Sequence, residues 1–138
     1  MNYPVSELDA ITPGIGNVLK SHKIRTTARL LENARTPKKR QTLADKTKIP
    51  VRDILRAVTM ADRLRVKGVG REHAELLEVA GVKTVQDLRY RNPANLAEAI
   101  AEAAAKHKEL RNLALLPSEK VICRWIESAK KLKNEVSY

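Results

Sequence analysis

Apolar residues recur along this chain three or four positions apart, and no segment alternates strictly between apolar and polar residues as a half-buried strand would. Between residues 50 and 65, Val51, Ile54, Leu55 and Val58 fall on one side of a helix and predict its core face. The pattern predicts an all-α protein of about nine short helices. The expected helices lie near residues 5–11, 15–22, 26–34, 37–47, 50–65, 71–80, 84–91, 93–111 and 117–133.

Residues that favour helix starts stand at several of these boundaries. Thr36-Pro37 and Asn92-Pro93 each place a capping side chain before a proline at the first helical position. Thr84 stands three residues before an aspartate, the spacing of a capping box. The connections between helices are therefore expected to be short.

An internal repeat organises the helices. Residues 11–16 (Ile-Thr-Pro-Gly-Ile-Gly) match residues 65–70 (Arg-Val-Lys-Gly-Val-Gly) at an offset of 54, and residues 24–30 match residues 82–88 at an offset of 58. The change of four residues preserves helical phase and predicts that the helix after the first glycine pair is about one turn shorter than its counterpart. The expected parts are a first repeat unit, a basic connector, a second repeat unit and a C-terminal helix, at residues 1–36, 37–63, 64–111 and 112–138.

Composition narrows the class of partner. The 138 residues include 27 Lys and Arg against 16 Asp and Glu, and the net charge of +11 favours a polyanion, nucleic acid ahead of an anionic membrane surface. Three Tyr, one Trp and no Phe are too few aromatic residues to build the stacking platforms of single-strand binders. The composition therefore favours double-stranded nucleic acid held through its phosphates.

Other classes of protein are disfavoured. No apolar run approaches the roughly 20 residues that span a bilayer, and the N-terminus lacks the basic and apolar parts of a signal peptide. The only cysteine, Cys123, excludes an intramolecular disulfide framework, and its apolar neighbours predict a place in the core. We expect a cytoplasmic protein that does not bind membranes.

Positive charge is concentrated between the two glycine pairs. Residues 37–67 carry ten basic and three acidic side chains. On the helix expected over residues 50–65, Arg52, Arg56 and Arg63 fall together along one side and form a basic stripe. The stripe suits a phosphate backbone, and a solvated helix flank explains it equally well. Basic residues outside the segment, such as Lys130 and Lys131, are expected to contribute less to binding a polyanion.

The two Gly-x-Gly turns have a physical use. Glycine allows a sharp turn with positive φ, and a β-branched residue at Gly68 or Gly70 is expected to damage the turn. The helix that follows begins with unpaired N–H groups and the positive end of its dipole. A phosphate oxygen can approach those amides closely because no Cβ shields them. A turn that merely joins two helices explains the same residues.

These residues resemble a known motif. Residues 8–16 and 64–77 are similar to helix-hairpin-helix units, which recur in DNA ligases, repair nucleases, glycosylases and polymerases and contact duplex phosphates without reading sequence. The whole chain also resembles a bacterial family of uncharacterised tandem helix-hairpin-helix proteins, through residues 61–70 and 115–130. The resemblance implies a helical bundle of the SAM-domain-like kind.

The resemblance also implies which residues bind DNA. The first hairpin would use Gly14, Ile15, Gly16 and Asn17, and the second would use Lys67, Gly68, Val69, Gly70 and Arg71. The second is the better candidate because Lys67 and Arg71 bracket it, whereas no basic residue stands near the first before Lys20. Hairpin carbonyls in such proteins can also hold a monovalent cation, and no other cofactor is implied.

The sequence gives little support for a catalytic or metal-binding function. His22, His73 and His107 lie far apart and form no metal-ligand pair, and no nucleophile stands beside a base. Residues 40–56 have the apolar spacing of a helix-turn-helix without its usual glycine, which two tightly packed helices explain as well. Small residues over 97–105 suit close helix packing, within the chain or against a second subunit.

The sequence thus favours a non-enzymatic protein that binds duplex DNA without sequence preference. A protein-interaction module or scaffold with the same fold and no DNA binding is the alternative. A transcription regulator that uses residues 40–56 ranks third.

Overall fold

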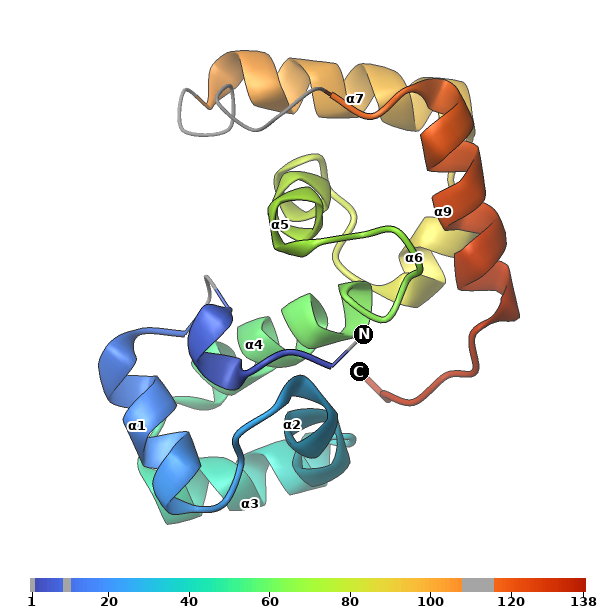
Figure 1. Ribbon diagram of the computed structural model, residues 1–138. Helices are drawn as coiled ribbons and strands as arrows, with labels where there is room; N and C mark the ends of the chain where they lie inside the picture. Colours follow the sequence, from blue (N-terminus) through green and yellow to red (C-terminus); the bar gives the residue numbers. More distant parts are fainter. Residues whose placement is uncertain (1, 9–10, 108–115) are drawn as a thin grey trace. The chain divides into compact units, whose positions relative to one another are not determined.

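The computed structural model describes residues 2–8, 11–107 and 116–138. Over these ranges the chain is helical and holds no strand, only an isolated bridge between Pro4 and Thr26, so the expected all-α fold is confirmed. The described residues form one 3-10 helix and eight α-helices (Figure 1): η1 Val5–Glu7, α1 Pro13–Ser21, α2 Thr27–Asn33, α3 Pro37–Thr47, α4 Val51–Arg63, α5 Arg71–Val79, α6 Val85–Arg89, α7 Pro93–Lys106 and α9 Glu119–Lys131.

Side-chain caps fix the starts of three helices as the sequence predicts. The side-chain oxygens of Thr36, Thr84 and Asn92 each accept a hydrogen bond from the amide three residues further on. Two predicted helices differ in extent. Among the described residues of the segment at 5–11, Val5–Glu7 form η1, and the helix expected over 93–111 corresponds to α7, which ends at Lys106. Residues 9–10 and 108–111 of these two predictions lie outside the described ranges.

The chain folds as two compact units. Unit 1 comprises residues 1–65 and 134–138, and unit 2 comprises residues 66–133. Residues 37–63, expected as a connector, contain α3 and α4 of unit 1, and α9 belongs to unit 2. Unit 1 has 14 basic and 7 acidic residues and unit 2 has 13 and 9, so both carry net positive charge.

In unit 1, α4 packs against α2 and α3. Ile54 and Val58 are at most 2% exposed, as the apolar pattern predicts, but Val51 and Leu55 are 41% and 38% exposed. The expected core face is therefore wrong in part. The buried small residues of α4, Ala57 among them, shift the centre of the core face away from Val51 and leave Leu55 about 100° from it.

In unit 2, α9 packs against α6 and α7, and α5 packs against α7. Trp125, Ile122 and Ile126 of α9 are buried and form the apolar face of that helix. Ala103 and Ala104 of α7 are also buried. For these two residues, the close packing that small side chains allow takes place inside the chain.

The internal repeat appears in the structure as equivalent hydrogen bonds 58 residues apart. The Ile24 amide donates to the Leu19 carbonyl at 2.9 Å, and the Val82 amide donates to the Leu77 carbonyl at 2.8 Å. Helices α1 and α5 have nine residues each, but only five residues of α1 follow Gly16 whereas all nine residues of α5 follow Gly70, so the helical segment after the first glycine pair is one turn shorter, as predicted. The first glycine pair lies inside the first turn of α1, whereas the second precedes α5, and this accounts for the change in offset.

The last residues of the chain contact a buried arginine of unit 1, Arg40. Arg40 is 3% exposed, and its guanidinium donates to the carbonyl oxygens of Ala34 at 3.0 Å and Ser137 at 2.8 Å. Its centre lies 5.8 Å from that of the Tyr138 ring, whose hydroxyl donates to Asp62 Oδ2 at 3.0 Å. Burial lowers the pKa of Arg40, and burial together with the Asp62 carboxylate raises the pKa of Tyr138 and keeps its hydroxyl a donor.

Arg40→Met is expected to lower the free energy of unfolding by about 1–3 kcal/mol, because it leaves two partly or fully buried carbonyl oxygens without a donor. Lys38→Met on the exposed side of the same helix should change it by less than about 0.5 kcal/mol. Urea unfolding followed by circular dichroism measures both. Equal unfolding midpoints for Arg40→Met and the wild type would show that Arg40 does not hold the end of the chain.

Candidate functional site

The second glycine pair forms a tight turn in front of α5. Gly68 has φ +91°, a backbone conformation that glycine adopts without strain. A Cβ at this position would lie 3.3 Å from Trp125 Nε1, so the indole occupies the space beside the turn. The Lys67 amide donates to Ser128 Oγ at 3.1 Å, and the Val69 side chain is buried. The turn is therefore tied to α9 by the Lys67–Ser128 hydrogen bond and anchored in the core by the Val69 side chain.

Helix α5 begins without a side-chain cap. Its N-cap residue is Gly70, whereas the equivalent residue in the first repeat, Thr12, caps α1 by accepting from the Ile15 amide at 3.3 Å. Gly70 has extended backbone, and a Cβ built there meets no atom within 4 Å. The expectation that Gly70 is needed for the turn is wrong, because φ is negative and the adjacent space is open. Glycine there places no side chain in front of the first amides of α5.

The first glycine pair is built differently. Gly14, Ile15, Gly16 and Asn17 all lie within α1, after the capping residue Thr12. The Ile15 amide donates to the Thr12 hydroxyl, and the Gly16 amide donates to the Thr12 carbonyl at 2.9 Å. These bonds occupy donors that the predicted first phosphate cradle requires. The structure therefore corrects the expectation that the first pair forms an open hairpin like the second.

A groove of about 880 Å³ lies beside the second hairpin in unit 2. Lys67 and Gly68 form one side, and α9 and Leu132, the residue after it, form the other. We call the basic residues that line it the groove cations: Lys67, Lys120, Arg124 and Lys131. None of them pairs with a carboxylate of the described residues, and the one carboxylate in the lining, Glu127, lies 3.5 Å from Lys130. The groove thus carries uncompensated positive charge.

Much of the lining of the groove is apolar. Val121, Trp125 and Leu132 contribute to its lining. Trp125 is only 1% exposed and contacts His73, with ring centres 5.0 Å apart, so it offers no open face on which a base could stack. Cys123 also lines the groove and is half-exposed, which corrects its expected place in the core.

The predicted basic stripe on α4 is not continuous. Arg52 and Arg56 are exposed, but Arg63 is 1% exposed and its guanidinium lies 3.8 Å from the Met60 sulfur. Arg63 therefore cannot reach a phosphate in this fold, and its expected role is wrong. The next basic residue, Arg65, pairs with Asp62 at 2.7 Å, so part of the charge between the glycine pairs is structural.

The α3–α4 pair retains the feature that a helix-turn-helix needs at its turn. Lys48 follows α3 and has φ +64°, the conformation for which such turns usually use glycine.

The remaining predicted site residues lie outside the groove. Arg71, at the start of α5, is exposed but does not line the groove. His22 and His107 are not brought to a common site with other ligands, since no cluster of three or more His, Cys, Asp or Glu suited to a metal occurs among the described residues.

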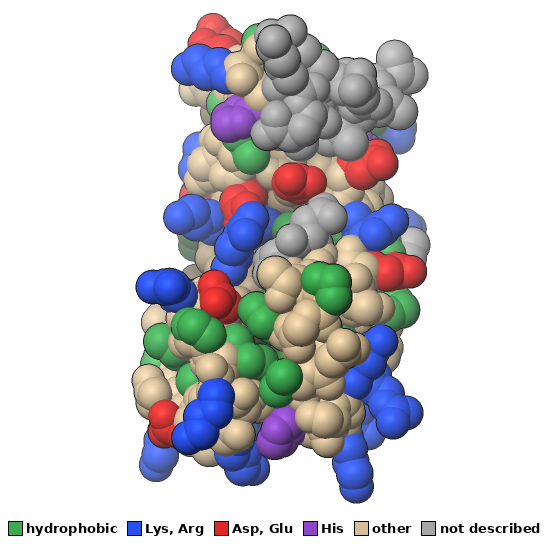
Figure 2. All heavy atoms as spheres, turned by 90° about the vertical axis from the view of Figure 1, so that its left-hand side faces the viewer, with side chains coloured by type: hydrophobic (Ala, Val, Ile, Leu, Met, Phe, Trp, Pro, Cys, Tyr) green, Lys and Arg blue, Asp and Glu red, His purple; other side chains and the backbone are tan. Residues whose placement is uncertain are grey.

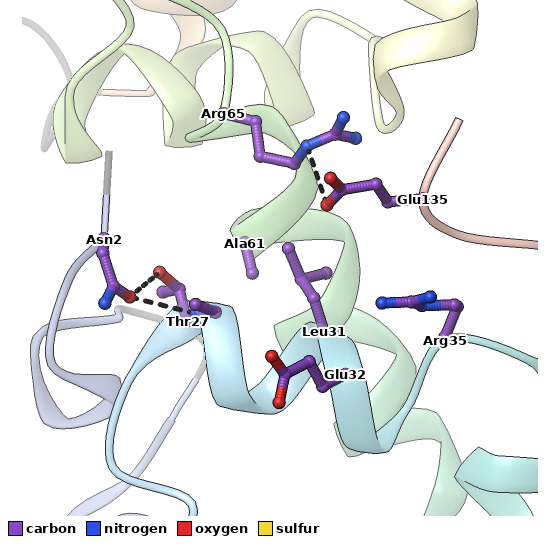
Figure 3. Close-up of a pocket in the computed structure, with 9 residues that line it drawn as sticks. Asn2, Thr27, Leu31, Glu32, Arg35, Ala61, Arg65 and Glu135 are labelled. Carbon is purple, nitrogen blue, oxygen red and sulfur yellow. Dashed lines mark hydrogen bonds and ion pairs between the residues drawn. The ribbon is translucent and has the colours of Figure 1, made fainter. Parts of the chain in front are cut away.

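Another cavity, of about 450 Å³, lies in unit 1 (Figure 3). Its lining includes both signs of charge, and Arg65 Nε lies 3.4 Å from Glu135 Oε2. The side-chain oxygen of Asn2 accepts hydrogen bonds from Thr27 and Ala28. Most polar groups in this cavity thus have partners within the protein, in contrast to the groove cations.

Basic side chains are distributed rather than gathered over the face shown in Figure 2, where Lys and Arg alternate with acidic and apolar side chains. The groove beside α9 is distinguished by basic side chains that have no carboxylate partner among the described residues. Within the described ranges, no helix has both the length and the apolar character needed to cross a membrane.

Sequence reasoning missed three of the groove cations, namely Lys120, Arg124 and Lys131. They lie four and seven residues apart on α9, away from the buried face that holds Ile122 and Trp125. A helical projection of residues 119–131 would have separated the two faces. The expectation that Lys131 contributes less to binding than the residues between the glycine pairs was based only on its position in the sequence. In the structure, Lys131 lines the same groove as Lys67.

The fold and the groove define a small helical protein of two units with an internal repeat and a cationic surface. Residues 10–132 match the family described as Domain of unknown function (DUF4332), and the chain belongs to this family. No curated protein and no solved structure matches it. Membership of this family does not specify a ligand.

Gly68→Ala is expected to lower the free energy of unfolding by about 1–3 kcal/mol, because alanine disfavours the positive φ and its methyl group would press on Trp125. Gly70→Ala should cost less than about 1 kcal/mol, because the space is open and only the capping preference changes. Chemical unfolding followed by fluorescence of Trp125, the only tryptophan, reports on unit 2. Equal losses for the two variants would contradict this account of the turn.

Proposed function

We propose that the protein binds duplex DNA without sequence preference and without catalysing a reaction, and that unit 2 carries the principal contacts. The observation that supports this most is the set of four groove cations without carboxylate partners beside a helix that begins uncapped. Both features attract phosphate, one through side-chain charge and the other through backbone amides. Lys67 and Gly68 line the groove and precede the start of α5 by at most four residues, so the two features are neighbours along the chain.

The two features suit an extended polyanion better than a single small anion. Lys120 and Lys131 are eleven residues apart on α9, which corresponds to about 16 Å along the helix axis. B-form DNA presents one charge for about every 1.7 Å of its axis, so a duplex offers several phosphates over that length. Contacts of this kind fix position without reading bases, which is why no sequence preference is expected.

One acidic residue opposes binding at the hairpin. Glu72 lies in the first turn of α5 and is exposed. Its carboxylate interacts favourably with the positive end of the same helix and competes with a phosphate for it. The groove cations are therefore proposed as the larger contribution, with the hairpin amides of Gly70 and Arg71 adding to it.

A protein partner is the second candidate function. The apolar lining from Val121, Trp125 and Leu132 favours it, because phosphates make no use of apolar surface. An acidic amphipathic segment would match both the apolar lining and the groove cations. Binding of random-sequence duplex separates the two functions, since a groove reserved for a protein segment predicts no duplex binding even at low salt.

Replacing groove cations should change the salt dependence of duplex binding. Four phosphate contacts in the groove contribute about −3.6 to the slope of log K against log[salt], which alone weakens binding roughly 150-fold between 50 and 200 mM salt. Lys67→Gln with Lys131→Gln should flatten the slope by about 1.8 on two unrelated duplexes alike. Fluorescence anisotropy over a salt series measures this.

The matched control is Lys83→Gln with Lys106→Gln, which removes the same charge from exposed positions of unit 2 outside the groove. It should leave the slope close to that of the wild type. If both pairs flatten the slope equally, the contacts are not localised in the groove. Binding to only one of the two duplexes would instead favour a regulator that uses residues 40–56.

A further inference from the structure

Unit 1 carries a cationic groove of its own, on α3. Its volume is about 380 Å³, and its lining includes three lysines, which we call the α3 lysines: Lys38, Lys39 and Lys46. None of the three forms an ion pair with a carboxylate of the described residues. This groove lies in the sequence segment with the greatest excess of positive charge, in which Arg40 and Arg63 are buried.

The remaining lining groups do not cancel that charge. The one carboxylate, Glu32, lies 3.3 Å from Arg29 and is exposed with it, so an arginine already neutralises it. Thr42 donates its hydroxyl to the Lys38 carbonyl, and the Asn33 side-chain amide donates to the Arg29 carbonyl. The ammonium groups of Lys38 and Lys46 are thus the lining groups that remain available to a ligand, whereas that of Lys39 also donates to the Glu32 carbonyl.

The arrangement of the lysines indicates an extended ligand. Lys38, Thr42 and Lys46 follow one another at intervals of four residues and lie along one face of α3, over about 12 Å. The Thr36 hydroxyl already accepts from the Lys39 amide, so the end of the helix is capped and contributes little as an anion site. The positive charge of this groove is therefore spread along α3 rather than concentrated at the start of the helix.

We propose that the α3 lysines form a second surface for duplex phosphates, on unit 1, in addition to the groove cations of unit 2. The inference rests on the proposed function, because the ligand is the same duplex. A line of ammonium groups about 12 Å long can meet several phosphates of a B-form backbone, which carries a charge for about every 1.7 Å of axis. Residues 37–67, with a net charge of +7, then contribute to DNA binding through α3 and not through the predicted stripe on α4.

The test variant is Lys38→Gln with Lys46→Gln. Lys39 is left in place because its ammonium also donates to the Glu32 carbonyl at 3.3 Å, and its loss could disturb α2. The matched control is Lys20→Gln with Arg25→Gln, which removes two exposed charges from the same unit outside this groove. Thermal unfolding of both variants should match the wild type, since all four side chains are exposed.

Anisotropy titrations of the full chain with a random-sequence duplex, over a salt series, give the readout. The Lys38/Lys46 variant should flatten the slope of log K against log[salt] by about 1.8, whereas the Lys20/Arg25 control should leave it unchanged. A wild-type slope for the Lys38/Lys46 variant, or equal flattening by both pairs, would overturn this inference while leaving the unit 2 site in place. Absence of wild-type binding at low salt would overturn both.

Discussion

The contact between the Trp125 indole and the Gly68 turn is the packing on which unit 2 depends. The indole fills the space in which any other residue at position 68 would place its Cβ, and Ser128 on the same helix accepts from the neighbouring Lys67 amide. These contacts hold the hairpin against α9. The groove lies between the hairpin and α9, so it depends on the contacts that hold these two elements apart at a fixed distance. The same contacts place Lys67 in one groove with the cations of α9.

Burial decides which positive charges are available. Arg40 and Arg63 are almost fully buried, and Arg65 pairs with Asp62 and Glu135, so these three arginines stabilise or fill unit 1. Charge in the interior of a protein is retained only where partners compensate for lost solvation. The groove cations lie at the surface and have no carboxylate partner among the described residues, and this difference separates the cations that we propose for binding from the structural arginines.

Much of the fold follows from local sequence, whereas the site does not. Thr36, Thr84 and Asn92 start helices where predicted because a cap depends on neighbours only three residues away. The two glycine pairs look alike locally, yet Thr12 caps the helix that contains the first, and Gly70 leaves the second uncapped. Lys67 and Lys131 line one groove because tertiary packing brings together residues more than sixty positions apart, and sequence periodicity does not encode that packing.

The most direct test of the account uses Cys123, the only cysteine, which lines the groove and is half-exposed. The rate at which a small thiol reagent modifies Cys123 is measured with and without saturating random-sequence duplex, at low salt and at high salt. If duplex DNA occupies the groove, modification should slow at low salt and recover at high salt, because the contacts are electrostatic. An unchanged rate under conditions where anisotropy shows the duplex bound would place the DNA elsewhere and contradict the account.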